Sequence, residues 1–250
     1  MPMLRVDINC DLGEGGAHDA ALMPLITSAN IACGGHAGDE ATMRATIRLA
    51  LEHGVAVGAH PGLADRKNFG RVEQPLTPAG AGTLVLEQTE RLQRLAEELG
   101  GLVTHVKPHG ALYNMAARDA ALARAVAEAV YEADSRLTLV GLAGSRLTEA
   151  GLACGLRILH EVFADRTYQA DGSLTPRSRP DALITDGELV VAQVLRMVRE
   201  GRVRATDGSE VEIKADTLCL HGDGPNPVLF ARELRRELES VGVEIRRPGG

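Results

Sequence analysis

The sequence has no tryptophan, and it has only three tyrosines and three phenylalanines among 250 residues. Proteins that bind single-stranded nucleic acid stack the bases on aromatic side chains, so this scarcity argues against that class. The formal net charge of −7 points the same way, because binding to a phosphate backbone relies on an excess of Lys and Arg. We therefore expect no nucleic-acid partner.

Long apolar runs are absent as well. The sequence contains no run of about 18 apolar residues, the length that a membrane-spanning helix needs. The first seven residues also lack the basic and apolar regions of a signal peptide. The four cysteines are scattered without a CxxC pair, which is typical of reduced thiols. The sequence therefore predicts a cytoplasmic protein with no membrane partner.

Three nucleotide and hydrolase motifs are missing. The chain contains no GxxxxGK[ST] loop, no GxGxxG fingerprint and no GxSxG elbow. We expect that this chain does not bind a nucleotide by itself and is not a serine hydrolase.

Short strand-like runs and longer helical runs alternate along the whole sequence. Strands are expected at residues 4–10, 28–33, 55–59, 102–106, 137–141, 157–162 and 217–220, and helices at 39–53, 77–99, 118–133, 187–200 and 227–241. No low-complexity linker divides the chain, so we predict one catalytic α/β domain over residues 1–250 with a mostly parallel sheet.

An open doubly wound sheet and a closed barrel both fit this alternation. Polar clusters follow at least five of the expected strands, at residues 7–11, 36–39, 60–62, 105–109 and 221–223. A parallel barrel brings the carboxyl ends of all its strands to one rim, whereas an open sheet concentrates its site at one switch point. The distribution favours a (β/α) barrel.

Asp7, Asn9 and Asp11 alternate along the first strand, so their side chains share one face, and Glu14 continues the row. An EF-hand loop is excluded, because its glycine and terminal glutamate positions do not match. The row is either a solvated edge or a pocket wall that binds a cation or orients a water molecule.

His105, Lys107 and His109 would share a face of another strand end, and Lys107 is one of only three lysines. We expect the flanking histidines to depress the pKa of Lys107. His36, His60 and His221 lie in comparable clusters. Asp39 is an expected helix N-cap as well as a site candidate. Glu161, Asp165 and Arg166 form either a site segment or, for the last two, a surface ion pair.

Together these motifs resemble the LamB/YcsF family. The resemblance rests on residues 6–14, 28–39, 58–62, 69–71, 105–114, 161–166 and 221–223, in the family's order. The chain departs from the family's pattern at Gly15-Gly16, Gly35 and Val72, which border the expected pocket.

The resemblance implies a distorted (β/α) barrel related to the glycoside hydrolase/deacetylase superfamily. It also implies cleavage of 5-oxo-L-proline to L-glutamate coupled to hydrolysis of ATP to ADP and phosphate, with two partner subunits, PxpB and PxpC. ATP would be a co-substrate bound by the partners. The alternatives are a metal-dependent carbohydrate deacetylase and a non-catalytic lactam-binding subunit.

Within this frame we assign catalytic roles to four residues. Asp11, with Asp7 and Glu14 nearby, positions or deprotonates the attacking water, Lys107 stabilises developing negative charge, and His109 protonates the departing ring nitrogen. The expected substrate-binding residues are Asp7, Asn9, His36, Asp39, His60, His105, Glu161, Asp165, Arg166 and His221. The sequence leaves open whether a divalent metal binds and whether the chain forms a homo-oligomer.

Overall fold

Seven parallel strands form a closed barrel in the computed structural model, which describes residues 4–220 and 227–247. The barrel strands are β1 (Arg5–Leu12), β2 (Ser28–Ala32), β3 (Ala56–His60), β4 (Val103–Val106), β5 (Thr138–Leu142), β6 (Arg157–Phe163) and β9 (Thr217–Leu220). Each strand pairs with the next in this order, and pairing of β1 with β9 closes the ring. The expected barrel is therefore confirmed over the described residues, and the open sheet is excluded.

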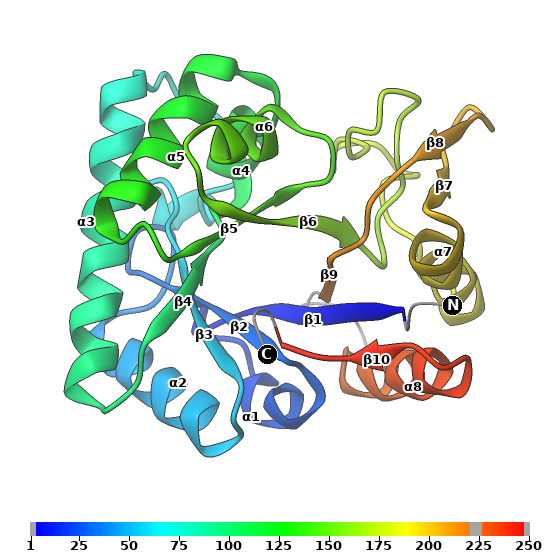
Figure 1. The fold of residues 1–250 in the computed structure, drawn as a ribbon, viewed down its shortest axis with the longest axis horizontal. Helices are drawn as coiled ribbons and strands as arrows, with labels where there is room; N and C mark the ends of the chain where they lie inside the picture. Colours follow the sequence, from blue (N-terminus) through cyan, green and yellow to red (C-terminus); the bar gives the residue numbers. More distant parts are fainter. Residues whose placement is uncertain (1–3, 221–226, 248–250) are drawn as a thin grey trace.

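Helices follow most of the strands and cover the outside of the barrel (Figure 1). They are α1 (Asp19–Leu22), α2 (Glu40–Glu52), α3 (Pro78–Glu98), α4 (Gly110–Arg118), α5 (Ala120–Ala133), α6 (Arg146–Ala153), α7 (Gly187–Glu200) and α8 (Pro227–Ser240), with 3₁₀ turns at Met23–Leu25 and Arg66–Asn68. No helix within the described ranges is both long enough and apolar enough to cross a membrane.

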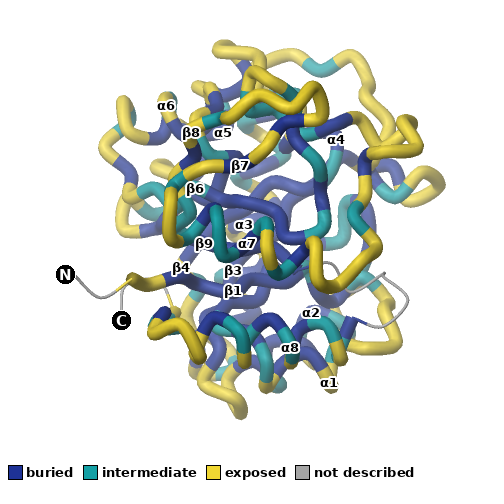
Figure 2. Tube along the Cα trace, turned by 90° about the vertical axis from the view of Figure 1, so that its right-hand side faces the viewer, coloured by how far each residue is buried: buried dark blue, intermediate teal, exposed yellow. Residues whose placement is uncertain are grey.

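The barrel strands β2, β3, β5 and β9 are buried along their whole length and therefore on both faces (Figure 2). Helices cover the outer face, and side chains fill the inside, as is usual for an all-parallel sheet. The inner face carries several polar groups in place of the usual branched apolar ones, including Asn9, Asn30 and His105. The barrel interior is therefore a polar core that leads up to the rim.

Most expected elements lie where the periodicity placed them, and α7 and β9 match to the residue. The helix expected at 118–133 is α5, which begins at Ala120 because Asp119 ends α4 and caps α5 by accepting hydrogen bonds from the N–H groups of Ala121 and Leu122. The sequence reasoning missed the helices α1, α4 and α6, the hairpin of β7 (Arg202–Arg204) and β8 (Glu210–Glu212), and the two-residue strand β10 (Glu244–Ile245). These strands are too short for a periodic pattern to develop.

Candidate active site

The carboxyl end of β1 delivers Asp11 to the rim of the barrel, where it meets Lys107. Lys107 lies just after β4, and its backbone N–H donates to the carbonyl of Ala59, which extends the strand pairing by one residue. Its side chain runs into the barrel, and Nζ lies 3.0 Å from Asp11 Oδ1 and 2.7 Å from Glu161 Oε1. A buried ammonium thus joins two carboxylates from two different strands.

Lys107 carries its charge more firmly than the sequence suggested. Burial alone would lower its pKa, but Asp11, Cys219 and Glu161 outweigh burial and raise the pKa well above its ordinary value. The expectation that neighbouring histidines depress the pKa of Lys107 is therefore wrong, because the carboxylates of Asp11 and Glu161 pair directly with its ammonium group. Lys107 is a fixed cation at the rim.

Glu161 is completely buried at the end of β6. Besides Lys107, it accepts hydrogen bonds from Asn9 Nδ2 at 3.0 Å and from Tyr113 Oη at 2.6 Å. Tyr113 lies on α4, and sequence reasoning did not assign it a role although it lies inside a quoted motif. A tyrosine on the buried face of a helix usually belongs to the hydrophobic core, so the sequence alone does not reveal that this one contacts Glu161.

Asn30 is a second residue that sequence reasoning missed. Its side-chain Nδ2 donates to both Asn9 Oδ1 and Asp11 Oδ1 at 2.8 Å, and its Oδ1 accepts from His105 Nε2 at 3.0 Å. It therefore fixes the orientation of the carboxylate that faces Lys107. The ring of His105 has room because residue 58 is glycine, whose added Cβ would lie 2.0 Å from the imidazole.

Glu14 and three histidines form a second group at the rim, which we call the histidine cluster (Glu14, His36, His60 and His109). One ligand-type atom from each of the four lies within 4.8 Å of all the others. His36 Nε2 is 2.9 Å from Glu14 Oε1, and His60 Nε2 is 2.9 Å from His109 Nδ1. The His36 and His109 rings stack at 3.6 Å between centroids.

The three histidines of the cluster differ in the direction in which their surroundings shift the pKa. Burial lowers the pKa of His36. Burial, together with the neighbouring His60 and His36, lowers the pKa of His109 to about 2. For His60, burial is outweighed by Asp11 and Glu14, and the pKa is raised. A neutral His109 does not fit the expected role as proton donor to a leaving nitrogen.

Several expected site residues lie away from this rim. Asp7 is buried lower in the barrel, where it accepts hydrogen bonds from the hydroxyls of Thr27, Ser28 and Thr217. His105 is also below the rim, and burial, with Lys107 and His60 adding to it, lowers its pKa to about 3. Asp39 caps α2 by accepting from Thr42 N. His221 lies outside the described residues.

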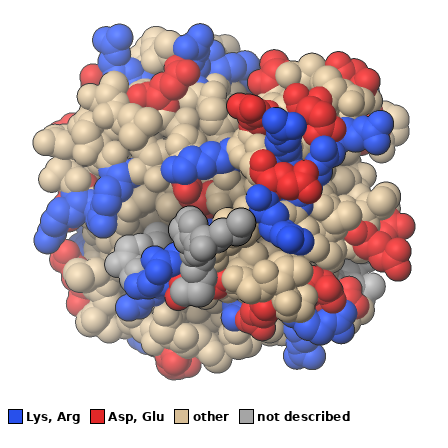
Figure 3. Space-filling model, turned by 45° about the vertical axis from the view of Figure 1, so that its right-hand side comes forward, with Lys and Arg blue, Asp and Glu red and all other residues tan. Residues whose placement is uncertain are grey.

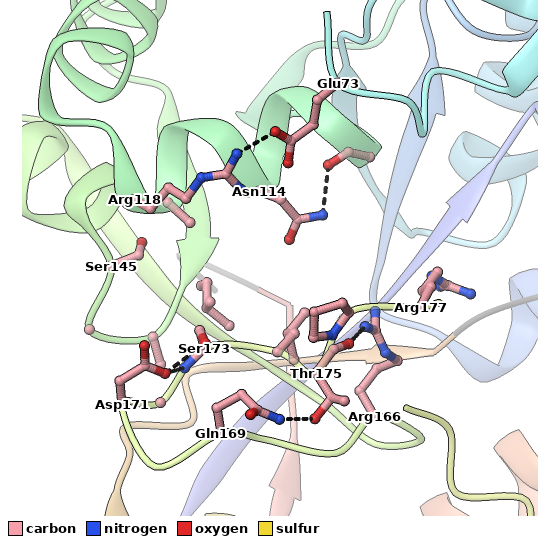
Figure 4. Close-up of a pocket in the computed structure, with 18 of the residues that line it drawn as sticks. Glu73, Asn114, Arg118, Ser145, Arg166, Gln169, Asp171, Ser173, Thr175 and Arg177 are labelled. Atoms are coloured by element: carbon pink, nitrogen blue, oxygen red, sulfur yellow. Dashed lines mark hydrogen bonds and ion pairs between the residues drawn. The ribbon is translucent and has the colours of Figure 1, made fainter. Parts of the chain in front are cut away.

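A cavity of about 850 Å³ lies beside the rim, between α4 and the segment that follows β6 (Figure 4). It begins at Gly110, one residue after His109. Arg166 lines it and is only 5% exposed, so the surface ion pair considered for it is wrong. Its guanidinium donates to the carbonyls of Thr175 and Ala182, and among the described residues no carboxylate lies within ion-pair distance of it.

Arg166 keeps its positive charge near neutral pH. Burial, with Arg177 nearby, lowers its pKa only to about 10. Figure 4 shows Arg166 and Asn114 on opposite walls of the cavity. A buried cation that lines a cavity of this size suits a small anionic ligand.

On the face in Figure 3, acidic and basic side chains intermingle rather than forming a broad patch of one sign.

Of the three departures from the family's pattern, Gly35 is the most constrained, because an added Cβ would lie 2.4 Å from Gly62 O. Val72 is 50% exposed, and an added Cβ at Gly15 would meet nothing within 4 Å.

Comparison with solved structures places this fold among deacetylase-type barrels. The catalytic domain of a peptidoglycan N-acetylglucosamine deacetylase from Eubacterium rectale aligns with a TM-score of 0.54 at 12% identity, over 99% of this chain and 90% of that one. A likeness at this identity concerns the fold alone.

Much stronger similarity identifies the family. The LamB/YcsF family model matches residues 6–249. A Bordetella pertussis protein that is named as one subunit of 5-oxoprolinase is 56% identical over 245 residues, covering 96% of this chain and 97% of that protein. The crystal structure of a lactam utilization protein from Thermus thermophilus aligns with a TM-score of 0.91 at 46% identity, over 97% and 99% of the two chains. The chain belongs to the LamB/YcsF family.

Proposed function

We propose that this chain is the ring-opening subunit of an ATP-dependent 5-oxoprolinase. The observation that carries the proposal is the buried cluster of Lys107, Asp11 and Glu161 at the barrel rim. A cavity lined by a buried arginine begins at Gly110, three residues along the chain from Lys107. The names of the relatives support the same substrate class, because 5-oxoproline is a lactam. The reaction converts 5-oxo-L-proline, ATP and two waters to L-glutamate, ADP and phosphate.

ATP is needed because a five-membered lactam is an unreactive amide. Transfer of the terminal phosphoryl group to the lactam oxygen makes the ring carbon more electrophilic. Addition of water to that carbon and cleavage of the C–N bond open the ring, and a second water hydrolyses the resulting acyl phosphate. The first addition moves the C=N electron pair onto the ring nitrogen, and loss of the proton of the new hydroxyl group then gives an oxyanion whose collapse breaks the C–N bond. A fixed cation in a water-poor site stabilises that oxyanion best.

Each rim residue has a distinct part in this scheme. Asp11 accepts a proton from the attacking water and passes it to the ring nitrogen, and it relays the proton of the new hydroxyl group to the same nitrogen as the C–N bond breaks. Its carboxylate suits this role because it is oriented by Asn30 and is partly open to solvent. Lys107 stabilises the oxyanion, and Glu161 holds Lys107 in place. Arg166 binds the carboxylate of 5-oxoproline from the cavity wall.

Two partner subunits, PxpB and PxpC, supply ATP binding and phosphoryl transfer in this proposal. The absence of a phosphate-binding loop motif in this sequence fits that division of labour. The relatives' names, which designate one lettered subunit of 5-oxoprolinase, are also consistent with an enzyme of several chains.

The test measures L-glutamate formation from 5-oxoproline and ATP with this chain alone, with the partners alone, and with all three together. We expect turnover only from the combination, and we expect the Arg166→Gln variant to raise KM for 5-oxoproline more than it lowers kcat. Turnover by the partners without this chain would overturn the proposal. Release of acetate from an N-acetylated sugar by this chain alone would favour the deacetylase alternative, and normal turnover in every rim variant would favour a non-catalytic lactam-binding role.

A further inference from the structure

We propose that the histidine cluster is a binding site for one divalent transition-metal ion, with Glu14, His36, His60 and His109 as its ligands. The inference stands on the geometry of these four residues and does not depend on which substrate the enzyme takes.

The hydrogen bonds of two histidines fix which nitrogen atoms are free to bind a metal. His60 Nδ1 lies 2.7 Å from the carbonyl oxygen of Lys107, and His109 Nε2 lies 2.9 Å from that of Phe69. A carbonyl oxygen only accepts, so each of these nitrogens carries the hydrogen. The opposite nitrogens, His60 Nε2 and His109 Nδ1, therefore present lone pairs.

These two lone pairs face each other at 2.9 Å. The carboxylate oxygen of Glu14 lies 3.3 Å from His109 Nδ1 and 3.8 Å from His60 Nε2. Three electron-rich atoms in such proximity repel one another unless a cation lies among them. The cation is either a metal ion or a proton, and a proton would make His60 an imidazolium.

The separations fit a metal. For a tetrahedral ion with bonds of about 2.0–2.1 Å to nitrogen, neighbouring ligand atoms lie about 3.3 Å apart. Four of the six separations between ligand atoms, 2.9, 2.9, 3.3 and 3.8 Å, bracket that value, and none of the six exceeds 4.8 Å. Small rotations of the side chains would bring all four atoms to bonding distance.

His36 adds an observation that a proton does not explain. Its Nε2 points to Glu14, while its buried Nδ1 has no hydrogen-bond partner among the described residues. A hydrogen bond to Glu14 alone is a weak reason to keep an imidazole buried with one unpaired nitrogen. A bond from Nε2 to a metal gives a larger compensation.

The backbone around the cluster is shaped to hold these rings. Phe69, whose carbonyl orients His109, is the one non-glycine residue with positive φ in the described chain, at 55°. Added Cβ atoms at Gly62 and Gly70 would lie 2.5 Å from His36 Nδ1 and 2.7 Å from His36 Cβ. The rings can stack here only because both positions are glycine.

Three imidazole nitrogens and one carboxylate oxygen define the class of metal. Nitrogen-rich sets bind zinc and similar first-row ions, whereas magnesium and calcium prefer oxygen. Such an ion would place a Lewis acid beside Asp11, whose Oδ2 lies 3.3 Å from His60 Nε2.

The test uses the full chain stripped with a chelator and titrated with ZnCl₂ and, separately, CoCl₂. Bound metal is measured by equilibrium dialysis and elemental analysis, and cobalt coordination by visible absorption. The variants are Glu14→Gln and His60→Gln, and the matched control is His53→Gln at the exposed end of α2. Circular dichroism verifies that each variant folds.

We expect one equivalent of metal in the unmodified chain and in His53→Gln, with a tetrahedral cobalt spectrum. Affinity should fall in Glu14→Gln and His60→Gln by at least the factor of roughly 10–100 that loss of an outer-shell partner costs. Absence of stoichiometric metal in the unmodified chain, or equal binding by all folded variants, would overturn the site. Because the readout is binding, that result would leave the proposed ring opening untouched.

Discussion

Asp7 and Asp11 are the same residue type on the same face of the same strand, yet the barrel gives them different surroundings. Asp7 is 3% exposed and accepts hydrogen bonds from three hydroxyl groups, with no cation among these partners. Asp11, four residues further along β1, faces the ammonium of Lys107 at the partly open rim. Burial raises the pKa of Asp7 although the three hydroxyls pull it down.

Alternation along β1 does not distinguish a structural carboxylate from a catalytic one. The depth of the side chain in the barrel and its hydrogen-bond or ion-pair partners make that distinction. Neutral donors satisfy Asp7 and leave it no route to a ligand. A cation and an amide orient Asp11 while one of its oxygens remains near the histidine cluster.

Lys107→Met should be the most damaging change at the rim. It would leave Asp11 and the fully buried Glu161 without their shared cation, and breaking a buried ion pair by removing one partner costs about 3–5 kcal/mol. The free energy of unfolding, measured by denaturant titration, should fall by that amount, and turnover with the partners should be lost.

Lys214→Met is the matched control, because the Lys214 side chain is 67% exposed and its pair with Asp216 lies at the surface. We expect a change of at most about 1 kcal/mol in that variant. The double variant Lys107→Met/Glu161→Gln should recover part of the lost stability. A Lys107→Met protein with unchanged stability would mean that the ion pairs of Lys107 with these two carboxylates do not stabilise the fold.

Asp11→Asn should reduce turnover of the assembled enzyme by roughly 10²-fold, the usual scale for loss of a general base. Asp7→Asn should instead affect stability: we expect the free energy of unfolding to fall by about 1–3 kcal/mol, because one amide oxygen cannot accept from all three hydroxyls. Turnover per folded molecule and denaturant titration of both variants provide the measurement. A loss of turnover in folded Asp7→Asn as large as that in Asp11→Asn would erase the contrast.

Sequence reasoning could find the barrel and the rim but not this contrast. Period-two alternation placed Asp7, Asn9 and Asp11 on one face, and strand ends rich in polar residues indicated one rim. Depth within the barrel depends on the register between strands, such as Asp7 beside Thr217, which a single sequence does not contain. The partners Tyr113 and Asn30 are likewise set by packing between segments far apart in the chain.

His105 on β4 lies inside the barrel and His109 lies at its rim, as Asp7 and Asp11 do on β1. The burial of His105 leads us to expect that stability depends on pH. Its pKa of about 3 in the folded protein lies below the ordinary value of 6.5. A histidine with a depressed pKa must be neutral to fold, so its unfolded form binds more protons and stability falls as the pH drops below 6.5. Between pH 7 and pH 5 the loss from this residue is about 2 kcal/mol.

The measurement compares the free energy of unfolding at pH 7 and pH 5 for the unmodified chain and for His105→Gln, whose amide can still donate to Asn30. The variant should lose about 2 kcal/mol less over this interval. Equal losses in both proteins would show that His105 does not titrate between the folded and unfolded states in this range.

Asp39 gives the smallest effect and tests a carboxylate wholly outside the barrel. Its side chain accepts from Thr42 N at the start of α2 and has no contact with Asp11 or the histidine cluster among its hydrogen bonds. Asp39→Ala removes the cap and should lower Tm by about 2–4 °C, whereas Asp39→Asn, which can still cap, should melt near the unmodified chain. Turnover with the partners should be unchanged in both variants. A rise in KM for 5-oxoproline in Asp39→Asn, whose helix cap is intact, would instead place this carboxylate in contact with the substrate and extend the site beyond the rim.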